Sequence, residues 1–257
     1  MRDDVDLHIH TARIGCANET MSVPALLERC EQDGITTIAI TDHLNTPDQL
    51  PTHLQIKEDL RAYQGPVKIT WGVEVNVIDK DTGAVSINEE QIEEAGFEFV
   101  IGGPHSTYFT EPDPKGIIDL QHKLMMAVVE NPLIHVLVHP WWFGRGEFEN
   151  GTLAWLTDLQ QVPEEHIDEL AEAAVSTGTA IEMNASAVIT NPMYVPAFQE
   201  DYKRYFRDLY DRGVSFTVGS DAHDINSIVR TKLAAQYLDE IGVPDERIVV
   251  PPPSDLS

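Results

Sequence analysis

The chain has 257 residues and a net charge of −26, because 43 acidic residues outnumber 17 Lys and Arg. This length suits one large domain or two small ones, and a hydrophobic content of 42% is enough for a folded core. The acidic residues recur along the whole chain rather than forming a tail. A surface this negative disfavours binding to long nucleic acids and to anionic membranes.

Two cysteines, Cys16 and Cys30, are too few for a disulfide framework and fit a reducing compartment. The first ten residues hold no apolar segment of signal-peptide length, and no stretch reaches the ~20 apolar residues of a membrane span. The sequence therefore predicts a soluble, cytoplasmic protein.

Seven short apolar runs follow one another along the chain, and several are separated by segments with helix signals. The runs are residues 5–9, 35–40, 67–77, 97–101, 134–138, 179–183 and 214–218. Predicted helices extend from Ser22 to Gly34 and from Pro163 to Gly178, and a third includes residues 202–210. Strands that alternate with helices indicate parallel strands joined by right-handed crossovers.

The number of runs favours a closed or nearly closed α/β barrel over an open doubly wound sheet. The open sheet is also disfavoured because no Gly-rich phosphate-binding loop follows any of the runs. We see no internal repeat and no low-complexity linker. We therefore predict a single barrel domain over residues 1–250, followed by a short Pro-rich tail at residues 251–257.

The histidines are the informative residues, because six of the ten lie at the end of an apolar run or just after it. These six are His8, His10, His43, His105, His139 and His223, and the carboxylates of Glu74 and Asp221 share their placement. The C-terminal ends of parallel barrel strands converge on one rim, so these side chains are expected to meet there. Buried imidazoles need partners, and a shared metal cluster supplies them. The other histidines (His53, His122, His135 and His166) are expected to be structural or exposed.

The ordered motifs DLHIHT, ITDHLN, GVEVN, GPHS, VHP, IEMNAS and GSDAH resemble the PHP (polymerase and histidinol phosphatase) family. The similarity spans nearly the whole chain and is greatest to the stand-alone metal-dependent phosphatases of that family. It implies a distorted (βα)7 barrel with a trinuclear metal site at the C-terminal rim of the strands.

The resemblance also implies the metal ligands. The first metal would have His8, His10, Glu74 and Asp221; the second would share Glu74 and have His105 and His139; the third would have His43 and His223. The family's remaining ligand is a histidine, and Cys16 stands in its place. A thiolate there would make the site softer. Alternatively, Glu19 donates instead, the third metal is weakly held or absent, or Cys16 is a small buried residue beside an altered site. We expect two to three divalent ions, which would be zinc, manganese or iron.

Two ions bridged by Glu74 suit the hydrolysis of a small phosphomonoester by a metal-activated hydroxide. Asp42 precedes His43 and is placed either to orient an imidazole, which we favour, or to transfer a proton; Asp6 is expected to orient as well. Arg13 and Arg145 are candidate phosphate-binding residues.

Two aspects of the function stay open in the sequence. The aromatic residues 141–143 form either a mobile cover for the substrate or a loop packed on the barrel. The same metal chemistry also permits hydrolysis of a phosphodiester or nucleotide, or of a C–N bond as in the related amidohydrolases. A barrel that retains metals without catalysis is a further, non-enzymatic alternative. The expected partner is a small phosphorylated substrate, with no long nucleic acid and no membrane.

Overall fold

The computed structural model describes residues 2–105 and 113–256. The remainder includes Ser106 of the GPHS motif, the first residue of the predicted domain and the last residue of the predicted tail. Within the described ranges, no helix combines the length and the apolar character needed to cross a membrane.

The described strands form a parallel sheet in the order β1-β2-β4-β5-β6-β7-β8, with the short β3 beside β4. They are β1 Val5–Ile9, β2 Thr37–Ile40, β3 His43–Leu44, β4 Lys68–Asn76, β5 Phe99–Gly103, β6 Val136–Leu137, β7 Ala180–Asn184 and β8 Phe216–Gly219. Each of the seven predicted apolar runs contains or overlaps one strand, and β3 was not predicted.

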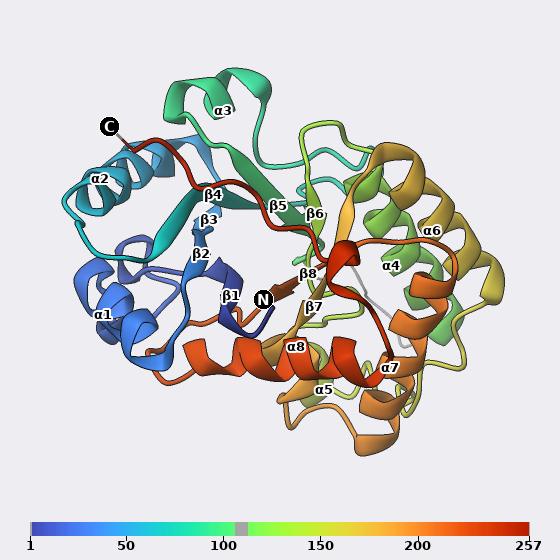
Figure 1. Ribbon diagram of the computed structural model, residues 1–257. Coiled ribbons are helices and arrows are strands. Elements are labelled where there is room, and N and C mark those ends of the chain that lie inside the picture. The colour runs from blue at the N-terminus through green and yellow to red at the C-terminus, as the bar shows by residue number, and fades with distance from the viewer. Residues whose placement is uncertain (1, 106–112, 257) are drawn as a thin grey trace.

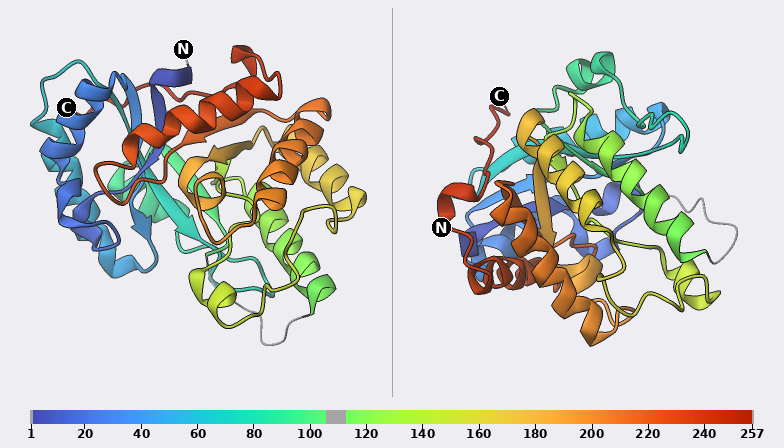
Figure 2. Two further views of the ribbon diagram at one scale, coloured as in Figure 1. Left: turned by 90° about the horizontal axis from the view of Figure 1, so that it is seen from below. Right: turned by 90° about the vertical axis from the view of Figure 1, so that its right-hand side faces the viewer.

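The α-helices of the described ranges lie around the outside of the sheet, with α1 and α2 on one side and α4, α6 and α7 on the other (Figures 1 and 2). They are α1 Val23–Asp33, α2 Leu50–Arg61, α3 Glu89–Ala95, α4 Pro114–Val129, α5 Arg145–Glu149, α6 Glu164–Thr177, α7 Pro196–Asp211 and α8 Thr231–Glu240. The predicted helix ends are confirmed for α1 and α6, where Gly34 and Gly178 take the left-handed conformation that favours glycine.

The barrel is nearly closed, and its one seam lies between β1 and β8. A parallel bridge joins Ile9 to Ala222, just beyond β8, and the backbone N–H of Asp221 donates to the carbonyl of His8 over 2.9 Å. The buried carboxylate of Asp6 accepts from the backbone N–H of Ser220 over 2.9 Å. These contacts place the first strand, β1, beside the residues that directly follow β8. They confirm the expected distorted (βα)7 barrel.

The C-terminal segment contacts the first residues of β4. The backbone N–H of Ser254 donates to the carbonyl of Ile69 over 2.9 Å, and its hydroxyl accepts from the N–H of Trp71 over 2.8 Å. Figure 1 shows this segment crossing the β4 end of the barrel on its way to the C-terminus. The predicted Pro-rich tail is therefore tied to the barrel by hydrogen bonds.

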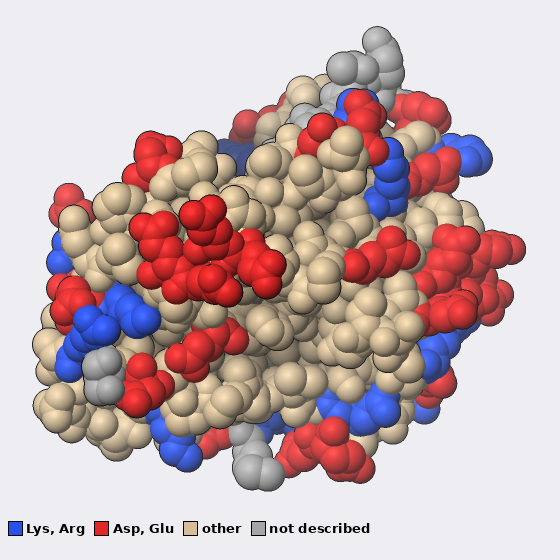
Figure 3. Space-filling view, turned by 90° about the horizontal axis from the view of Figure 1, so that it is seen from above, with Lys and Arg blue, Asp and Glu red and all other residues tan. Residues whose placement is uncertain are grey.

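The excess negative charge lies mostly on the surface. Helix α3 begins with Glu89 and Glu90, both exposed, and Figure 3 shows acidic side chains gathered in several clusters among fewer basic ones. The buried carboxylates of the described residues are those of Asp6, Asp42, Glu74, Glu147, Glu182 and Asp201. A buried carboxylate needs a hydrogen-bond donor or a cation as its partner, so such partners are expected around these six side chains.

Candidate metal centre

The C-terminal ends of the strands bring the predicted ligands together. The side chains come from β1 and the residue after it (His8, His10), β3 (His43), β4 (Glu74), the loops after β5 and β6 (His105, His139) and the segment after β8 (Asp221, His223). The register of the short β3 places His43 opposite Glu74 on β4. Residues far apart in the sequence therefore meet at one rim, as the histidine pattern predicts.

The first set of donor atoms combines His8, His10, Glu74 and Asp221. The Nε2 atoms of His8 and His10 lie 3.0 Å apart. Glu74 Oε2 lies 3.3 Å from the former and 3.4 Å from the latter. Asp221 Oδ1 lies 3.6 Å and 3.3 Å from the same two nitrogens. Both carboxylate oxygens thus lie within 3.6 Å of the two imidazole nitrogens.

The second set lies on the other oxygen of Glu74. Its Oε1 is 2.8 Å from His105 Nε2 and 3.1 Å from His139 Nε2, and these two nitrogens are 3.1 Å apart. Backbone contacts orient His105, whose Nδ1 faces the carbonyl of Gly103 at 3.0 Å and whose N–H donates to Asn76 Oδ1 over 3.0 Å. Asn76 of the GVEVN motif therefore helps to position a ligand of the neighbouring loop.

The third set contains Cys16 together with His10, His43 and His223, and their potential ligand atoms all lie within 4.8 Å of one another. The His223 ring is held by its Nδ1, which faces the carbonyl of Asp221 at 3.0 Å. Glu19 is exposed and belongs to none of the potential donor groups among the described residues. The structure thus brings Cys16, and not Glu19, to the imidazoles.

The donor sets fit divalent metal ions. Ligands about 2.0 Å from a tetrahedral ion are separated by roughly 3.3 Å, which matches the distances in the first two sets. Direct hydrogen bonding does not account for the arrangement, because Glu74 Oε2 is buried next to the imidazoles and has no hydrogen-bond partner among the described residues. Imidazole nitrogen with carboxylate oxygen is a donor chemistry that suits zinc, iron and manganese.

Glu182 supports this centre and was not recognised in the sequence. Its Oε1 accepts from His8 Nδ1 over 2.8 Å, while its Oε2 accepts from the backbone N–H of His139 over 2.9 Å and from Asn184 Nδ2 over 3.0 Å. Such a carboxylate fixes the tautomer of a metal-binding imidazole. The signal available in the sequence was a charged residue in the middle of strand β7, which is buried throughout.

The backbone at the rim is strained at two of the ligands. His139 has φ 29° and Asp221 has φ 53°, and left-handed values are unfavourable for residues with a side chain. The hydrogen bonds from His139 to Glu182 and from Asp221 to His8 hold these conformations. Strain of this kind persists where the surrounding structure imposes it, most often at functional sites.

Glu74 stays ionised although it is fully buried. Burial alone would raise its pKa, but the imidazoles of His43, His8 and His105 hold the pKa of this carboxyl well below its usual value. An ionised carboxylate with imidazoles against both oxygens is the form in which a carboxylate bridges two cations.

The two histidines of β1 differ in their surroundings. Burial opposes protonation of His8, yet the carboxylates of Glu182, Glu74 and Asp221 raise its pKa well above the usual value. For His10, burial prevails and lowers the pKa to about 3. Histidine binds metals as the neutral imidazole, so His10 is in the binding form near neutral pH, whereas His8 would have to lose a proton to bind a cation.

Asp42 contacts Thr11, whose backbone N–H and hydroxyl donate to its carboxylate over 2.8 Å and 2.9 Å. Asp6 is bound by the backbone N–H groups of Ser220 and His8. Within the described part of the chain, neither carboxylate forms a hydrogen bond to an imidazole, so the expected orienting role falls to Glu182. Burial raises the pKa of both Asp6 and Asp42 to about 7.

The structure does not bring the two predicted arginines to the metal centre. Arg13 Nε donates to Asp59 of α2 over 2.6 Å, and Arg145 Nε donates to Glu149 of α5 over 2.6 Å; both arginines are largely exposed. Their proximity in sequence to His10 and His139 does not carry their side chains to the ligands. Their catalytic role stays a prediction.

The aromatic residues after His139 pack on the barrel. Trp141 and Phe143 are buried, and the hydroxyl of Tyr194 accepts from the N–H of Phe143 and donates to the carbonyl of Trp141, both over 2.9 Å. Trp142 is only partly buried, and its ring centroid lies 5.5 Å from that of His139. Trp142 thus forms an apolar wall beside the ligands.

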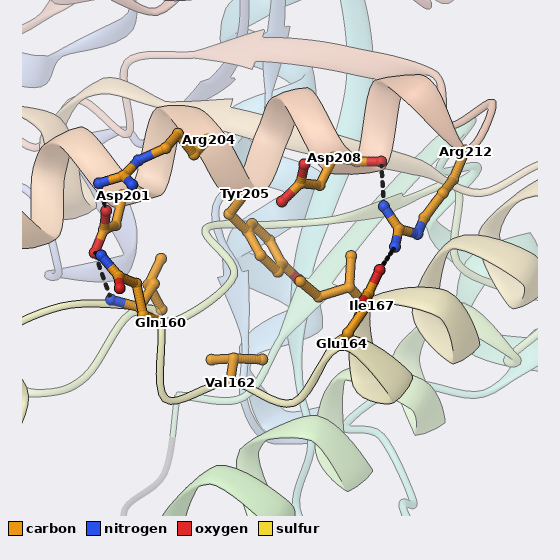
Figure 4. Close-up of a pocket in the computed structure, with 10 residues that line it drawn as sticks. Gln160, Val162, Glu164, Ile167, Asp201, Arg204, Tyr205, Asp208 and Arg212 are labelled. Carbon is orange, nitrogen blue, oxygen red and sulfur yellow. Dashed lines mark hydrogen bonds and ion pairs between the residues drawn. The ribbon is translucent and has the colours of Figure 1, made fainter.

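A cavity of about 350 Å³ lies away from this centre, between α7 and the segment that leads into α6 (Figure 4). Arg212 reaches Glu164 over 3.2 Å across it, and Arg204 pairs with Asp201. None of the strand-end histidines lines this cavity, and both of its arginines are already paired. It is separate from the metal centre.

Comparison with known proteins places the chain among phosphatase-like sequences. The sequence profile of the PHP domain family matches residues 6–186. A probable phosphatase of Syntrophotalea carbinolica is 27% identical over 252 residues, covering 97% of this chain and 92% of the relative. The probable phosphatase YcdX of Escherichia coli strain K12 is 25% identical over 248 residues, covering 95% of this chain and 89% of the relative.

Proposed function

Because the chain belongs to the PHP domain family, we propose that it is a metal-dependent phosphoesterase that hydrolyses small phosphomonoesters. The observation that carries this proposal is the position of Glu74. Its Oε1 lies against His105 and His139. Its Oε2 lies against His8 and His10, and 2.9 Å from His43 Nδ1. A carboxylate with a separate imidazole set on each oxygen fits a bridge between two cations, and paired cations suit displacement at phosphorus.

The proposed ligands are the three donor sets described above. The ions that they would hold supply Lewis-acid stabilisation of phosphoryl oxygens and a hydroxide nucleophile near neutral pH. Most of the ligands are neutral imidazoles, so a metal-loaded site keeps a positive charge despite the acidic surface. This local charge favours a small anionic substrate.

The chain's own residues hold and shape the site. Glu182 fixes the His8 ring through Nδ1, so that Nε2 faces Glu74 and Asp221. Asp42 lies beside His43, and its pKa of about 7 suits a group that takes up or releases a proton at neutral pH. We propose this proton-transfer role for Asp42 in place of the orienting role.

Arg230 is a further candidate for phosphate binding. It lies in the connection between β8 and α8, and its Nη1 is 3.4 Å from Ser186 Oγ, two residues beyond β7. Both segments follow C-terminal strand ends, so the guanidinium lies on the same rim as the ligands. Guanidinium groups bind phosphate oxygens in a forked geometry.

The size of the proposed substrate follows from the charge distribution. A long nucleic acid would bring many phosphates against the acidic surface clusters, whereas a single phosphoryl group needs only the rim. Trp142 offers an apolar face beside His105 and His139 for the organic part of the substrate. We therefore propose a small phosphorylated molecule as the partner.

The test is phosphate release by protein reconstituted with zinc, manganese or iron, with metal content measured on the same sample. Phosphomonoesters, a phosphodiester and an amide are compared as substrates. The His10→Ala variant is expected to lose turnover, whereas His166→Gln, on the outer helix α6, is expected to keep it. Loaded protein that hydrolyses none of the phosphomonoesters would contradict the proposal. Faster hydrolysis of the diester or the amide would favour the alternative hydrolase.

A further inference from the structure

Cys16 lies among imidazoles that come from three different parts of the chain. Its potential ligand atom and those of His10, His43 and His223 all lie within 4.8 Å of one another. His10 is fully buried and its Nδ1 has no hydrogen-bond partner among the described residues. A thiol grouped with imidazole nitrogens is a donor set that suits a soft divalent cation such as zinc.

Backbone contacts fix the loop that carries Cys16 against the loop that carries His223. Gly15 takes a left-handed conformation with φ 86° and donates to the carbonyl of Ala12 over 3.2 Å. Two residues after Cys16, the N–H of Asn18 donates to the carbonyl of His223 over 2.9 Å. The thiol therefore reaches the imidazoles without a rearrangement of the chain.

A second contact secures the same pair of loops. The hydroxyl of Thr20 accepts from the N–H of Ile225 over 3.2 Å. Two hydrogen bonds thus join the two loops, both of them just after Cys16 in the chain. This placement distinguishes Cys16 from Cys30, which is fully buried in α1 and belongs to none of the potential donor groups.

We propose that Cys16, as its thiolate, binds a third cation together with His43 and His223, with His10 beside them, and that this site selects zinc over manganese and magnesium. The inference rests on the metal centre of the proposed function and specifies one of its ions. On binding, the Cys16 S–H bond is replaced by a sulfur–metal bond and the proton goes to solvent. Thiolate and imidazole suit zinc, whereas manganese and magnesium prefer oxygen ligands.

The geometry is within reach of such a site. Bonds of about 2.0 Å to nitrogen and 2.3 Å to sulfur place tetrahedral ligands roughly 3.5 Å apart. The ligand atoms lie within 4.8 Å of one another, so a small change of side-chain rotamer is enough to bring them to bonding distance. Cys16 is exposed at the rim, so such a change meets little resistance.

The test uses the full chain loaded with cobalt(II), which replaces zinc and reports on its ligands. A thiolate ligand produces a sulfur-to-cobalt charge-transfer band in the near ultraviolet. Wild-type protein is expected to show this band, and Cys16→Ser is expected to lose it while still binding the ions of the other two sets. Cys30→Ala is the matched control and is expected to keep the band. Circular dichroism verifies that each variant is folded.

A zinc titration gives a second readout that does not depend on turnover. Cys16→Ser is expected to lower the zinc affinity of one equivalent by at least about tenfold, since even indirect perturbations of metal ligands have effects of this size. Cys16→His is expected to keep the third ion without the band and to lower the preference for zinc over manganese. Metal-loaded protein without the band, or a band that survives in Cys16→Ser, would overturn this inference but not the proposed function. Protein that binds no metal would overturn the proposed function as well.

Discussion

Glu182→Gln isolates the role of the carboxylate that supports His8. The carboxylate oxygens of Glu182 lie 2.8 Å from His8 Nδ1, 2.9 Å from His139 N and 3.0 Å from Asn184 Nδ2. The substitution keeps the size of the side chain but removes its charge, and it places an amide against these three nitrogens. One amide cannot accept from all three donors as the carboxylate does. Loss of such a supporting group costs about 10–100-fold in metal affinity or activity, or roughly 1.4–2.7 kcal/mol.

Glutamine is more informative than alanine at this position. Glu182→Ala would leave three buried donors unpaired, at about 1–3 kcal/mol each, so that general destabilisation would obscure the effect on the site. The assay is a metal titration against a competing chelator, followed by kcat and KM of the reconstituted protein. Glu172→Gln removes the same charge from the exposed side of α6 and serves as the matched control. The reasoning is refuted if Glu182→Gln binds metal and turns over within about twofold of the wild type.

Three further outcomes are expected. Gly219→Ala would place a Cβ 2.6 Å from His8 Cβ and closer still to Glu182 Oε1. The variant is therefore expected to lose metal binding in the same titration. Unchanged binding would mean that His8 and Glu182 are not held rigidly. Burial of His53 lowers its pKa from 6.5 to about 4. Between these two pH values the unfolded chain therefore binds more protons than the folded protein. The free energy of unfolding is thus greatest above about pH 6.5 and falls as the pH is lowered. In urea unfolding, the wild type should lose about 2 kcal/mol more than His53→Gln between pH 6.5 and about pH 5, and equal losses would contradict the assignment. Finally, a chelator should lower the free energy of unfolding by about 3 kcal/mol for each ion whose free concentration had been about a hundredfold above its Kd. A thermal melt that the chelator does not change would show that no ion stabilises the fold.

The histidine pattern predicts the site because parallel strands impose it. His8 and His10 alternate with apolar residues on a buried strand, and the C-terminal ends of such strands must meet at one rim. The fold and the convergence of the ligands therefore follow from local features. The apolar runs likewise locate the strands, because a strand buried on both faces carries few polar residues.

The support around the ligands does not follow from local features. Glu182 acquires its role only when the barrel closes, because β8 separates its strand β7 from β1, which carries His8, whereas His139 follows the neighbouring strand β6. The hydrogen bond between Asn18 and His223 likewise depends on closure of the barrel. Arg13 and Arg145 show the limit of sequence proximity, because in the structure their side chains pair with Asp59 and Glu149. Side-chain direction in loops is set by tertiary contacts that sequence spacing does not contain.

The central claim is that metal ions, bridged by Glu74, occupy the rim of the barrel. Anomalous diffraction from crystals of reconstituted protein, recorded on both sides of the metal absorption edge, tests it most directly. The account predicts one peak between Glu74 and the His8–His10 pair and a second between Glu74 and the His105–His139 pair. Crystals of metal-treated protein that give no peak against Glu74, or peaks only elsewhere on the surface, would contradict it.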